Sequence, residues 1–230
     1  MSGNARRRHV FVTGGTGYIG RALIDALLSR GHTVRALVRR GGSARLPPGV
    51  EFIVGNALDA SSYAREVVPA DTLVHLVGTP HPGTPGKTEA FRRVDLPSGL
   101  AAVDAALQAK VRHLVYVSVA QPAPVMKSYI LARSAVETRI REACGQAWLS
   151  ATILRPWYVL GPGHRWPYLL VPVYALMHRV PSTRASARRL GLVTLPQMIA
   201  ALVAAVEREP SGVEIVDVPR IGLGARALLR

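Results

Sequence analysis

Residues 13–20 read TGGTGYIG, and this stretch decides the fold. A short apolar run precedes it. Residues 18–31, which begin within this stretch and continue beyond it, have Ile19, Leu23 and Leu27 at helical spacing. The order is therefore a strand, a glycine-rich turn and a helix. In this context the backbone can approach a pyrophosphate closely, and the start of the helix supplies oriented amide groups. The stretch predicts that the protein binds a dinucleotide.

The residues expected to hold the dinucleotide phosphates all lie in this loop. Its glycines place no side chain between the backbone and the ligand, and the remaining residues form the turn into the helix. The full set is Gly14, Thr16, Gly17, Tyr18, Ile19 and Gly20.

Short apolar runs alternate with helical patterns along the rest of the chain. Strands are expected at 9–14, 33–39, 50–56, 71–78, 113–120, 149–156 and 212–219. The clearest later helical patterns cover 89–108 and 128–144. Strands that alternate with helices predict a parallel sheet covered on both faces, so the fold class is α/β, a doubly wound parallel sheet.

The length and composition predict a single domain. The chain has 230 residues, of which 49% are hydrophobic, enough for one buried core. We expect residues 8–155 to form the dinucleotide-binding core. Residues 156–230 are expected to form a small C-terminal segment that lines a substrate pocket.

The charge is strongly positive, at +15, from 29 basic and 14 acidic residues. Such a surface could attract nucleic acid, a membrane or an anionic ligand. The arginines are scattered, however, and no aromatic stripe accompanies them, so nucleic acid is not the expected partner. The apolar runs at 167–177 and 198–206 fall short of the ~20 residues that span a bilayer, so no membrane is expected either.

A cytoplasmic location is expected from two features. Cys144 is the single cysteine, so no internal disulfide can form, and a reducing compartment suits the chain. The first eight residues, MSGNARRR, lead into a strand without the apolar stretch of a secretory signal.

The choice of dinucleotide depends on the end of the second expected strand. A carboxylate there would bond the ribose hydroxyls of NAD. This chain instead has Arg39 and Arg40, whose guanidinium groups offer several donors to a 2′-phosphate. NADP is therefore the expected cofactor, with NAD possible.

Several motifs together carry a family resemblance. They are TGGTGYIG at 13–20, GNALD at 55–59, Ser118, Tyr129 and ILRPWYVLGPG at 153–163. In this combination the chain resembles the extended and atypical short-chain dehydrogenase/reductase superfamily, especially its NmrA-like and complex I accessory-subunit-like branches. The resemblance covers about residues 8–220 and implies a Rossmann fold.

The resemblance also implies further cofactor contacts. It places two residues after the third strand at the adenine, three after the fourth strand under a ribose, and three after the sixth strand beside the nicotinamide. In that order they are Asn56 and Ala57; Val77, Gly78 and Thr79; and Pro156, Trp157 and Tyr158.

The resemblance implies a catalytic group in which one residue departs from the pattern. Ser118 matches the serine that orients the substrate oxygen, and Tyr129 matches the tyrosine that transfers a proton. Arg133 stands where a lysine would hold the ribose and lower the tyrosine pKa. An arginine also supplies a fixed cation that favours the phenolate, but it stays protonated and cannot relay a proton.

The stretch RPWYVLGPGHRWPY is expected to build the substrate pocket. Its aromatic residues concentrate within a short segment, and a histidine and an arginine add anchors for an acidic or carbonyl-bearing ligand. The residues assigned to the substrate are His164, Arg165, Trp166 and Tyr168. No cluster with metal-ligand spacing and no G-x-S-x-G elbow occurs, so no metal is expected.

These features favour an NADP-dependent oxidoreductase that transfers a hydride to or from a small carbonyl or alcohol. Two alternatives stay open. The same scaffold hosts sugar-nucleotide epimerases and dehydratases, so the reaction type does not follow from the fold. The altered Tyr-x-x-x-Arg pair also suits a protein that binds NADP without catalysis, as a redox sensor or an assembly factor.

Overall fold

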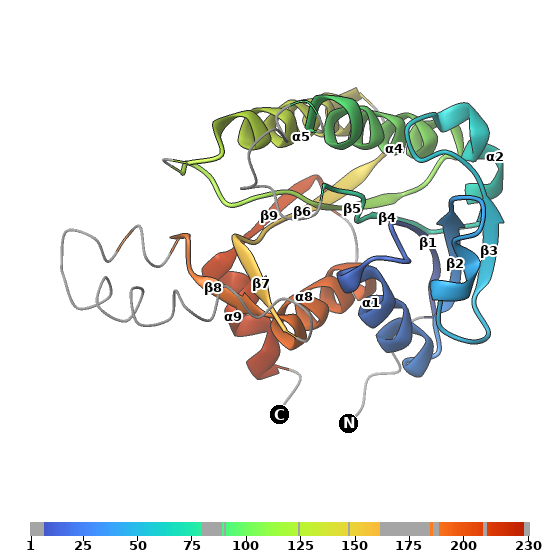
Figure 1. The fold of residues 1–230 in the computed structure, drawn as a ribbon, viewed down its shortest axis with the longest axis horizontal. Coiled ribbons are helices and arrows are strands. Elements are labelled where there is room, and N and C mark those ends of the chain that lie inside the picture. Colours follow the sequence, from blue (N-terminus) through green and yellow to red (C-terminus); the bar gives the residue numbers. More distant parts are fainter. Residues whose placement is uncertain are drawn as a thin grey trace.

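A seven-stranded parallel sheet forms the centre of the molecule (Figure 1). The strand order is β3-β2-β1-β4-β5-β6-β9, so the order reverses between β1 and β4. The strands are β1 (His9–Thr13), β2 (Thr33–Val38), β3 (Glu51–Val54), β4 (Thr72–His75), β5 (His113–Val117), β6 (Ser150–Arg155) and β9 (Val213–Asp217). The computed structural model describes residues 7–79, 89, 91–123, 125–146, 148–161, 185, 189–208 and 211–227.

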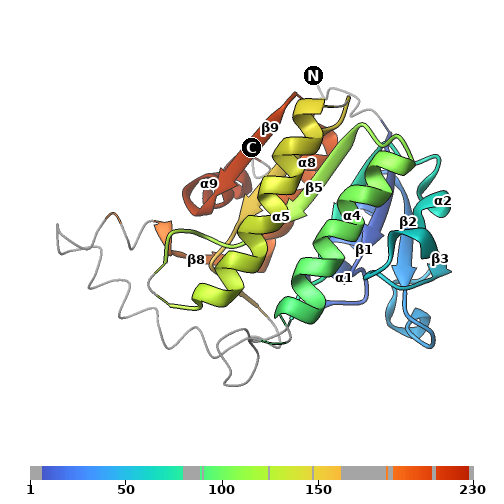
Figure 2. The ribbon, with the colours of Figure 1, turned by 90° about the horizontal axis from the view of Figure 1, so that it is seen from above.

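Helices cover both faces of this sheet (Figures 1 and 2). One face carries α2 (Ala64–Val67), α4 (Leu96–Gln108) and α5 (Lys127–Gln146), with α4 and α5 side by side. The other face carries α1 (Tyr18–Ser29), α8 (Leu195–Glu207) and α9 (Val218–Ala227). The predicted fold class, a doubly wound α/β sheet, is confirmed, and each predicted strand is present.

Shorter elements complete the described fold. A second, two-stranded parallel sheet pairs β7 with β8. The remaining elements are β7 (Tyr158–Leu160), β8 (Leu192–Thr194), the 3₁₀ turns η1 (Ser43–Arg45) and η2 (Ala60–Ser62), and the π-helical turn η3 (Phe91–Asp95).

The side-chain alternation of β1 divides the core into two layers. Val10 and Val12 point to the face covered by α1 and α8. Phe11 points to the opposite face, where its ring stacks 6.0 Å from that of Tyr63. Each of these side chains is fully buried, and burial of one such side chain contributes about 1.5–3 kcal/mol. The strand therefore anchors both helical layers and fixes the position of the glycine loop at its end.

The C-terminal part of the chain belongs to the central sheet as well. Strand β9 pairs with β6, and α8 packs against α1. Arg30 at the end of α1 donates from Nε and Nη2 to the two carboxylate oxygens of Glu207 at the end of α8, at 2.6 and 2.9 Å. The elements after residue 155 thus pack on those of residues 8–155, while the assignment of the two parts to dinucleotide binding and to a substrate pocket stays a prediction.

Two of the three buried histidines among the described residues, His75 and His113, have strongly lowered pKa values. The Nδ1 atom of His75 lies 2.8 Å from the hydroxyl of Thr13, and burial, together with the charge of Arg133, lowers the pKa of His75 to about 3. The Nε2 atom of His113 lies 2.9 Å from the hydroxyl of Thr152, and burial is the main cause that lowers the pKa of His113 to about 4. Both imidazoles are neutral in the folded protein near pH 7.

We expect the free energy of unfolding to fall as the pH drops from about 6.5 toward 4. The unfolded chain binds protons on both histidines below their ordinary pKa of about 6.5, whereas the folded protein does not, so protons favour unfolding. Each histidine should contribute about 1.4 kcal/mol per pH unit in this window. Urea denaturation at several pH values measures the slope.

A single substitution isolates the contribution of one histidine. His113→Gln removes a titrating group and should lower the slope by about 1.4 kcal/mol per pH unit, whatever its effect on stability at pH 7. An unchanged slope in this variant would show that His113 is protonated in the folded state as easily as in the unfolded state.

Candidate cofactor and active site

The glycine loop lies between β1 and α1, where the strand order reverses (Figure 1). Gly14 has φ of +79°, and a Cβ there would lie 2.7 Å from the backbone carbon of Leu76. A Cβ at Gly20 would overlap the carbonyl oxygen of Gly14. Both positions therefore require glycine for the loop to pass this close to β4 and α1.

The start of α1 presents its backbone amides without a capping side chain. Gly17 is the N-cap residue, it is exposed, and no side chain bonds the first amides of the helix. Four amide groups at a helix start lack partners within the helix, and a negatively charged phosphate is a favourable partner for them. The uncapped helix start is the feature on which the predicted phosphate site depends, and the site itself stays a prediction.

Arg39 and Arg40 follow the end of β2 and are exposed. Within the described ranges, neither side chain has a hydrogen bond or an ion pair. Their guanidinium groups are therefore available to an anionic ligand at this edge of the sheet.

The residues predicted at the adenine follow β3. The backbone amide of Asn56 donates to the hydroxyl of Ser62 at 3.0 Å, and its side-chain oxygen accepts from the amide of Leu58 at 3.1 Å. Ala57 packs against the core on the α4 side. These bonds hold the turn after β3, and the amide of Gly55 joins it to the end of β2; the contact of this turn with an adenine stays a prediction.

Arg133 is the best-connected side chain of the candidate active site. It is 3% exposed, and its Nη2 atom donates to Asp95 Oδ1 at 2.6 Å and to the carbonyl of Val77 at 3.1 Å. Its Nη1 atom donates to the carbonyl of Val117 at 3.0 Å and to the hydroxyl of Tyr116 at 3.3 Å. The guanidinium thus joins α5 to the carboxyl ends of β4 and β5.

The same guanidinium fixes the segment predicted to lie under a ribose. A Cβ at Gly78 would overlap Nη2 of Arg133. Next to it, the amide of Thr79 donates to both oxygens of Asp95 at 3.2 Å, and its hydroxyl donates to Oδ2. Asp95 therefore holds Arg133 and the end of the β4 segment at the same time.

Tyr129 and Arg133 lie on one face of α5, as predicted. The guanidinium carbon of Arg133 is 5.2 Å from the centre of the Tyr129 ring, and the ring of Phe91 is 5.0 Å away on another side. Tyr129 is partly exposed. The tyrosine therefore stands beside a buried cation while it keeps access to solvent.

Ser118 forms its contact further along the helix. Its hydroxyl is buried and donates to Glu137 Oε1 at 2.7 Å. Glu137 lies eight residues after Tyr129 on α5, which corresponds to about 12 Å at 1.5 Å per residue. The structure therefore brings Tyr129 together with Arg133, and Ser118 together with Glu137. The catalytic roles of these residues stay predictions.

Glu137 and Asp95 are buried carboxylates that the sequence reasoning missed. Besides Ser118, Glu137 accepts hydrogen bonds from Gln121, Arg141 and Arg155. A signal for Glu137 was present, since it continues the spacing of four that begins at Tyr129 and Arg133. Asp95 stands 38 residues from Arg133, and no local pattern links the two.

The residues predicted beside the nicotinamide lie at the end of β6. The carbonyl of Pro156 accepts from the amide of Ala120 at 2.9 Å, which ties this end to the segment after Ser118. The rings of Trp157 and Tyr158 are 5.3 Å apart, and burial raises the pKa of Tyr158. The predicted substrate residues His164, Arg165, Trp166 and Tyr168 lie outside the described residues.

The end of β7 reaches the glycine loop. A Cβ at Gly161 would overlap the hydroxyl of Tyr18, so the phenol of Tyr18 packs directly on this backbone. The first residue of α1 therefore contacts the segment that follows the predicted nicotinamide site.

The described part of the chain shows neither a metal-ligand cluster nor a membrane-spanning helix. Within it, no group of three or more His, Cys, Asp or Glu residues is placed to hold a metal ion. None of its helices has both the length and the apolar character that crossing a bilayer requires.

Comparison with known proteins identifies the family. Residues 14–165 match the model of a family described as NAD(P)H-binding. The chain belongs to this family. The resemblance to the short-chain dehydrogenase/reductase superfamily is confirmed, and the protein is an NAD(P)-binding member of this oxidoreductase and epimerase superfamily. The branch within the superfamily stays a prediction.

Two curated relatives are both named as reductases. The chain is 30% identical over 224 residues to a ceramide reductase of Caulobacter vibrioides, covering 96% of this chain and 68% of the relative. It is 33% identical over 111 residues to a 4-hydroxy-2-methyl-3-oxo-4-farnesyl-3,4-dihydroquinoline-1-oxide ketoreductase of Stigmatella aurantiaca, covering 47% of this chain and 32% of that relative. The chain thus spans about two thirds of one relative and one third of the other.

A solved structure agrees with the fold. The UDP-glucose 4-epimerase of Thermotoga maritima, determined with UDP-glucose, superposes with a TM-score of 0.67 at 18% identity. The match covers 91% of this chain and 76% of that chain. At this identity the likeness concerns the fold.

Proposed function

We propose that this protein is an NADP-dependent oxidoreductase that transfers a hydride to or from a small carbonyl or alcohol. The observation that carries the proposal is the uncapped start of α1 at the reversal of the strand order, together with Arg39 and Arg40 after β2, whose side chains have no hydrogen bond or ion pair among the described residues. These groups fit a pyrophosphate and a 2′-phosphate, respectively. The names of the two curated relatives, both reductases, support carbonyl reduction as the direction.

The residues of α5 supply the proton chemistry in this proposal. NADPH, when bound, supplies the hydride. The hydroxyl of Tyr129 donates the proton to the substrate oxygen, and the guanidinium of Arg133 lies 5.2 Å from the centre of the Tyr129 ring and positions it. The carboxylate of Asp95 forms an ion pair with the Arg133 guanidinium, which offsets the positive charge of the arginine and keeps the guanidinium in place.

Two further groups of the site, the Nε–H of Arg133 and the hydroxyl of Ser118, determine how a ligand is held. The Nε–H of Arg133 is buried and has no acceptor in the described part of the chain, and a ribose or substrate oxygen is the kind of acceptor that completes it. Ser118 gives its one hydroxyl proton to Glu137. While it keeps that bond, Ser118 has no proton to donate to a carbonyl oxygen, so in the proposed mechanism Tyr129 is the donor to that oxygen.

A second candidate function is NADP binding without catalysis, as a sensor or an assembly factor. The observation that favours it is that Arg133 makes four hydrogen bonds to atoms of the protein itself, which hold the guanidinium in the fold. The two functions differ in one measurement, because firm NADPH binding with no turnover of any carbonyl compound supports the second.

Two further assignments belong to the proposal. The segment 156–230 supplies the substrate pocket, next to the nicotinamide position at Pro156–Tyr158. The protein acts in the cytoplasm, where the single thiol of Cys144 stays reduced.

We expect the protein to bind NADPH more tightly than NADH. The double variant Arg39→Ala, Arg40→Ala should lose tenfold or more in NADPH affinity and little in NADH affinity, because charge-assisted bonds to a phosphate contribute about 1.5–3 kcal/mol. Calorimetric titration of both cofactors into the wild type and the variant measures the four affinities.

A matched control separates specific contacts from net charge. Arg112→Ala, Arg139→Ala removes two positive charges that pair with Asp71 and Asp104, away from the end of β2. This control variant should still bind NADPH more tightly than NADH. Equal affinity of the wild type for both cofactors would refute the assignment of NADP.

A further inference from the structure

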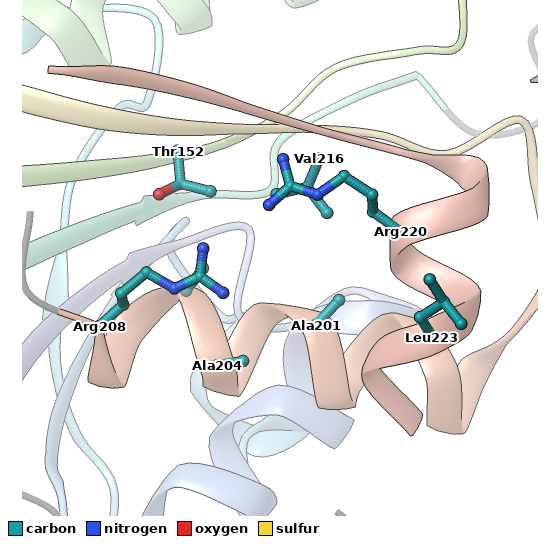
Figure 3. Close-up of a pocket in the computed structure, with 8 residues that line it drawn as sticks. Thr152, Ala201, Ala204, Arg208, Val216, Arg220 and Leu223 are labelled. Carbon is teal, nitrogen blue, oxygen red and sulfur yellow. The ribbon is translucent and has the colours of Figure 1, made fainter. Parts of the chain in front are cut away.

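A cavity of about 260 Å³ lies between the sheet and the helices α8 and α9 (Figure 3). Its floor is formed by Thr152 on β6 and Val216 on β9. Thr152 stands four residues before Pro156, or about 13 Å along the strand at 3.3 Å per residue. The cavity is therefore separate from the predicted nicotinamide position.

Small side chains keep this cavity open. Helix α8 faces it with Ala201, Ala204 and Ala205, whose methyl groups do not fill the space above the strands. Leu223 of α9 also lines it and is 59% exposed. The cavity thus has apolar walls and an opening to solvent, which together suit an apolar group that enters from outside.

Two guanidinium groups converge on the same cavity (Figure 3). Arg208 donates from Nη1 to the two oxygens of Glu214 at 2.6 and 2.5 Å, and Arg220 donates from Nη2 to the same carboxylate. Arg220 also donates from Nη1 to the carbonyl of Ile215 at 2.6 Å. The Nε and Nη2 atoms of Arg208, and Nε of Arg220, donate to no group among the described residues.

Arg208 and Arg220 share one carboxylate, that of Glu214, so these three side chains together carry one net positive charge. The carboxylate of Asp217 accepts from the backbone amide of Arg220 and forms no ion pair with either guanidinium. The buried guanidinium of Arg8 adjoins this cluster, with Nη2 3.5 Å from the carbonyl of Arg208. A singly charged anion would reduce the excess while it accepts from the unused N–H groups.

We propose that this cavity binds a small amphiphilic monocarboxylate. Its carboxylate accepts from the unused N–H groups of Arg208 and Arg220, and its hydrocarbon tail packs against the alanines of α8. At ~30 Å³ for each water-sized group, about eight non-hydrogen atoms fit the cavity. Hexanoate has this size and chemistry. The site does not depend on the proposed oxidoreductase activity.

Calorimetric titration of hexanoate into the full chain tests the proposal. We expect saturable binding of one hexanoate, and at least tenfold weaker binding of both hexan-1-ol, which lacks the charge, and acetate, which lacks the tail. Hexanoate should leave the NADPH affinity unchanged within twofold. No saturable binding of hexanoate, or competition between hexanoate and NADPH, would overturn the proposal.

Two variants locate the binding. Ala204→Leu fills the space and keeps both arginines, whereas Arg220→Gln keeps the space and leaves Glu214 paired with Arg208. Each should weaken hexanoate binding at least tenfold, and Arg139→Gln, on the opposite face of the sheet, should not. Circular dichroism establishes that each variant is folded. Unchanged hexanoate affinity in either folded cavity variant contradicts the assignment.

Discussion

Replacement of Asp95 by alanine should destabilise the protein by about 3–5 kcal/mol, the usual cost of breaking a buried ion pair by removal of one partner. The side chains of Arg133 and Asp95 are 4% and 0% exposed, so the arginine would remain as a buried cation without its carboxylate. The hydroxyl and amide of Thr79 would lose their acceptor as well. Urea denaturation monitored by circular dichroism measures the change.

The pair of Asp104 and Arg139 provides a matched control. It also joins α4 to α5, at 3.2 Å, but its side chains are 48% and 33% exposed. Asp104→Ala should therefore cost about 0–1 kcal/mol. A double-mutant cycle of Asp95→Ala with Arg133→Met should show a coupling on the order of 1–3 kcal/mol. If Asp95→Ala costs no more than Asp104→Ala, the pair does not stabilise the site.

If the protein is an enzyme, Tyr129→Phe should lower turnover by about 10²–10⁴ and leave NADPH affinity nearly unchanged. The variant keeps the ring that packs between Phe91 and the guanidinium of Arg133, and it removes only the exchangeable proton. NADPH consumption with a panel of ketones and aldehydes identifies a substrate, and the variant is then compared at saturating substrate.

Tyr63→Phe is the control for Tyr129→Phe. It also deletes a phenolic hydroxyl, but Tyr63 packs against Phe11 in the core, away from α5. Its hydroxyl has no hydrogen-bond partner within the described ranges, so turnover should stay unchanged. Turnover that survives Tyr129→Phe would remove this tyrosine from the mechanism.

Much of the fold was predictable because its signals are local. The glycine loop, the apolar runs and the helical spacing after residue 17 each depend on neighbours in sequence, and parallel order follows from their alternation. The position of Arg133 beside Tyr129 was predictable for the same reason, since a spacing of four fixes one helix face. These inferences needed no knowledge of distant contacts.

The partners of the site residues could not be predicted in the same way. Ser118 bonds a carboxylate 19 residues away, and the direction of its hydroxyl depends on how α5 packs on β5. Arg133 bonds Asp95 across 38 residues, a contact that exists only once α4 and α5 lie on the same face. Buried polar contacts of this kind leave no periodicity in the sequence, although their chemistry controls the site.

The packing of Arg133 against Gly78 and Asp95 has a consequence for substitutions at these positions. A lysine at position 133 would replace a planar group that makes four hydrogen bonds by an ammonium with three donors, and would leave part of this arrangement without a partner. A side chain at position 78 would in turn displace the guanidinium. The three positions therefore constrain one another, and we expect a change at one of them to be tolerated only with changes at the other two.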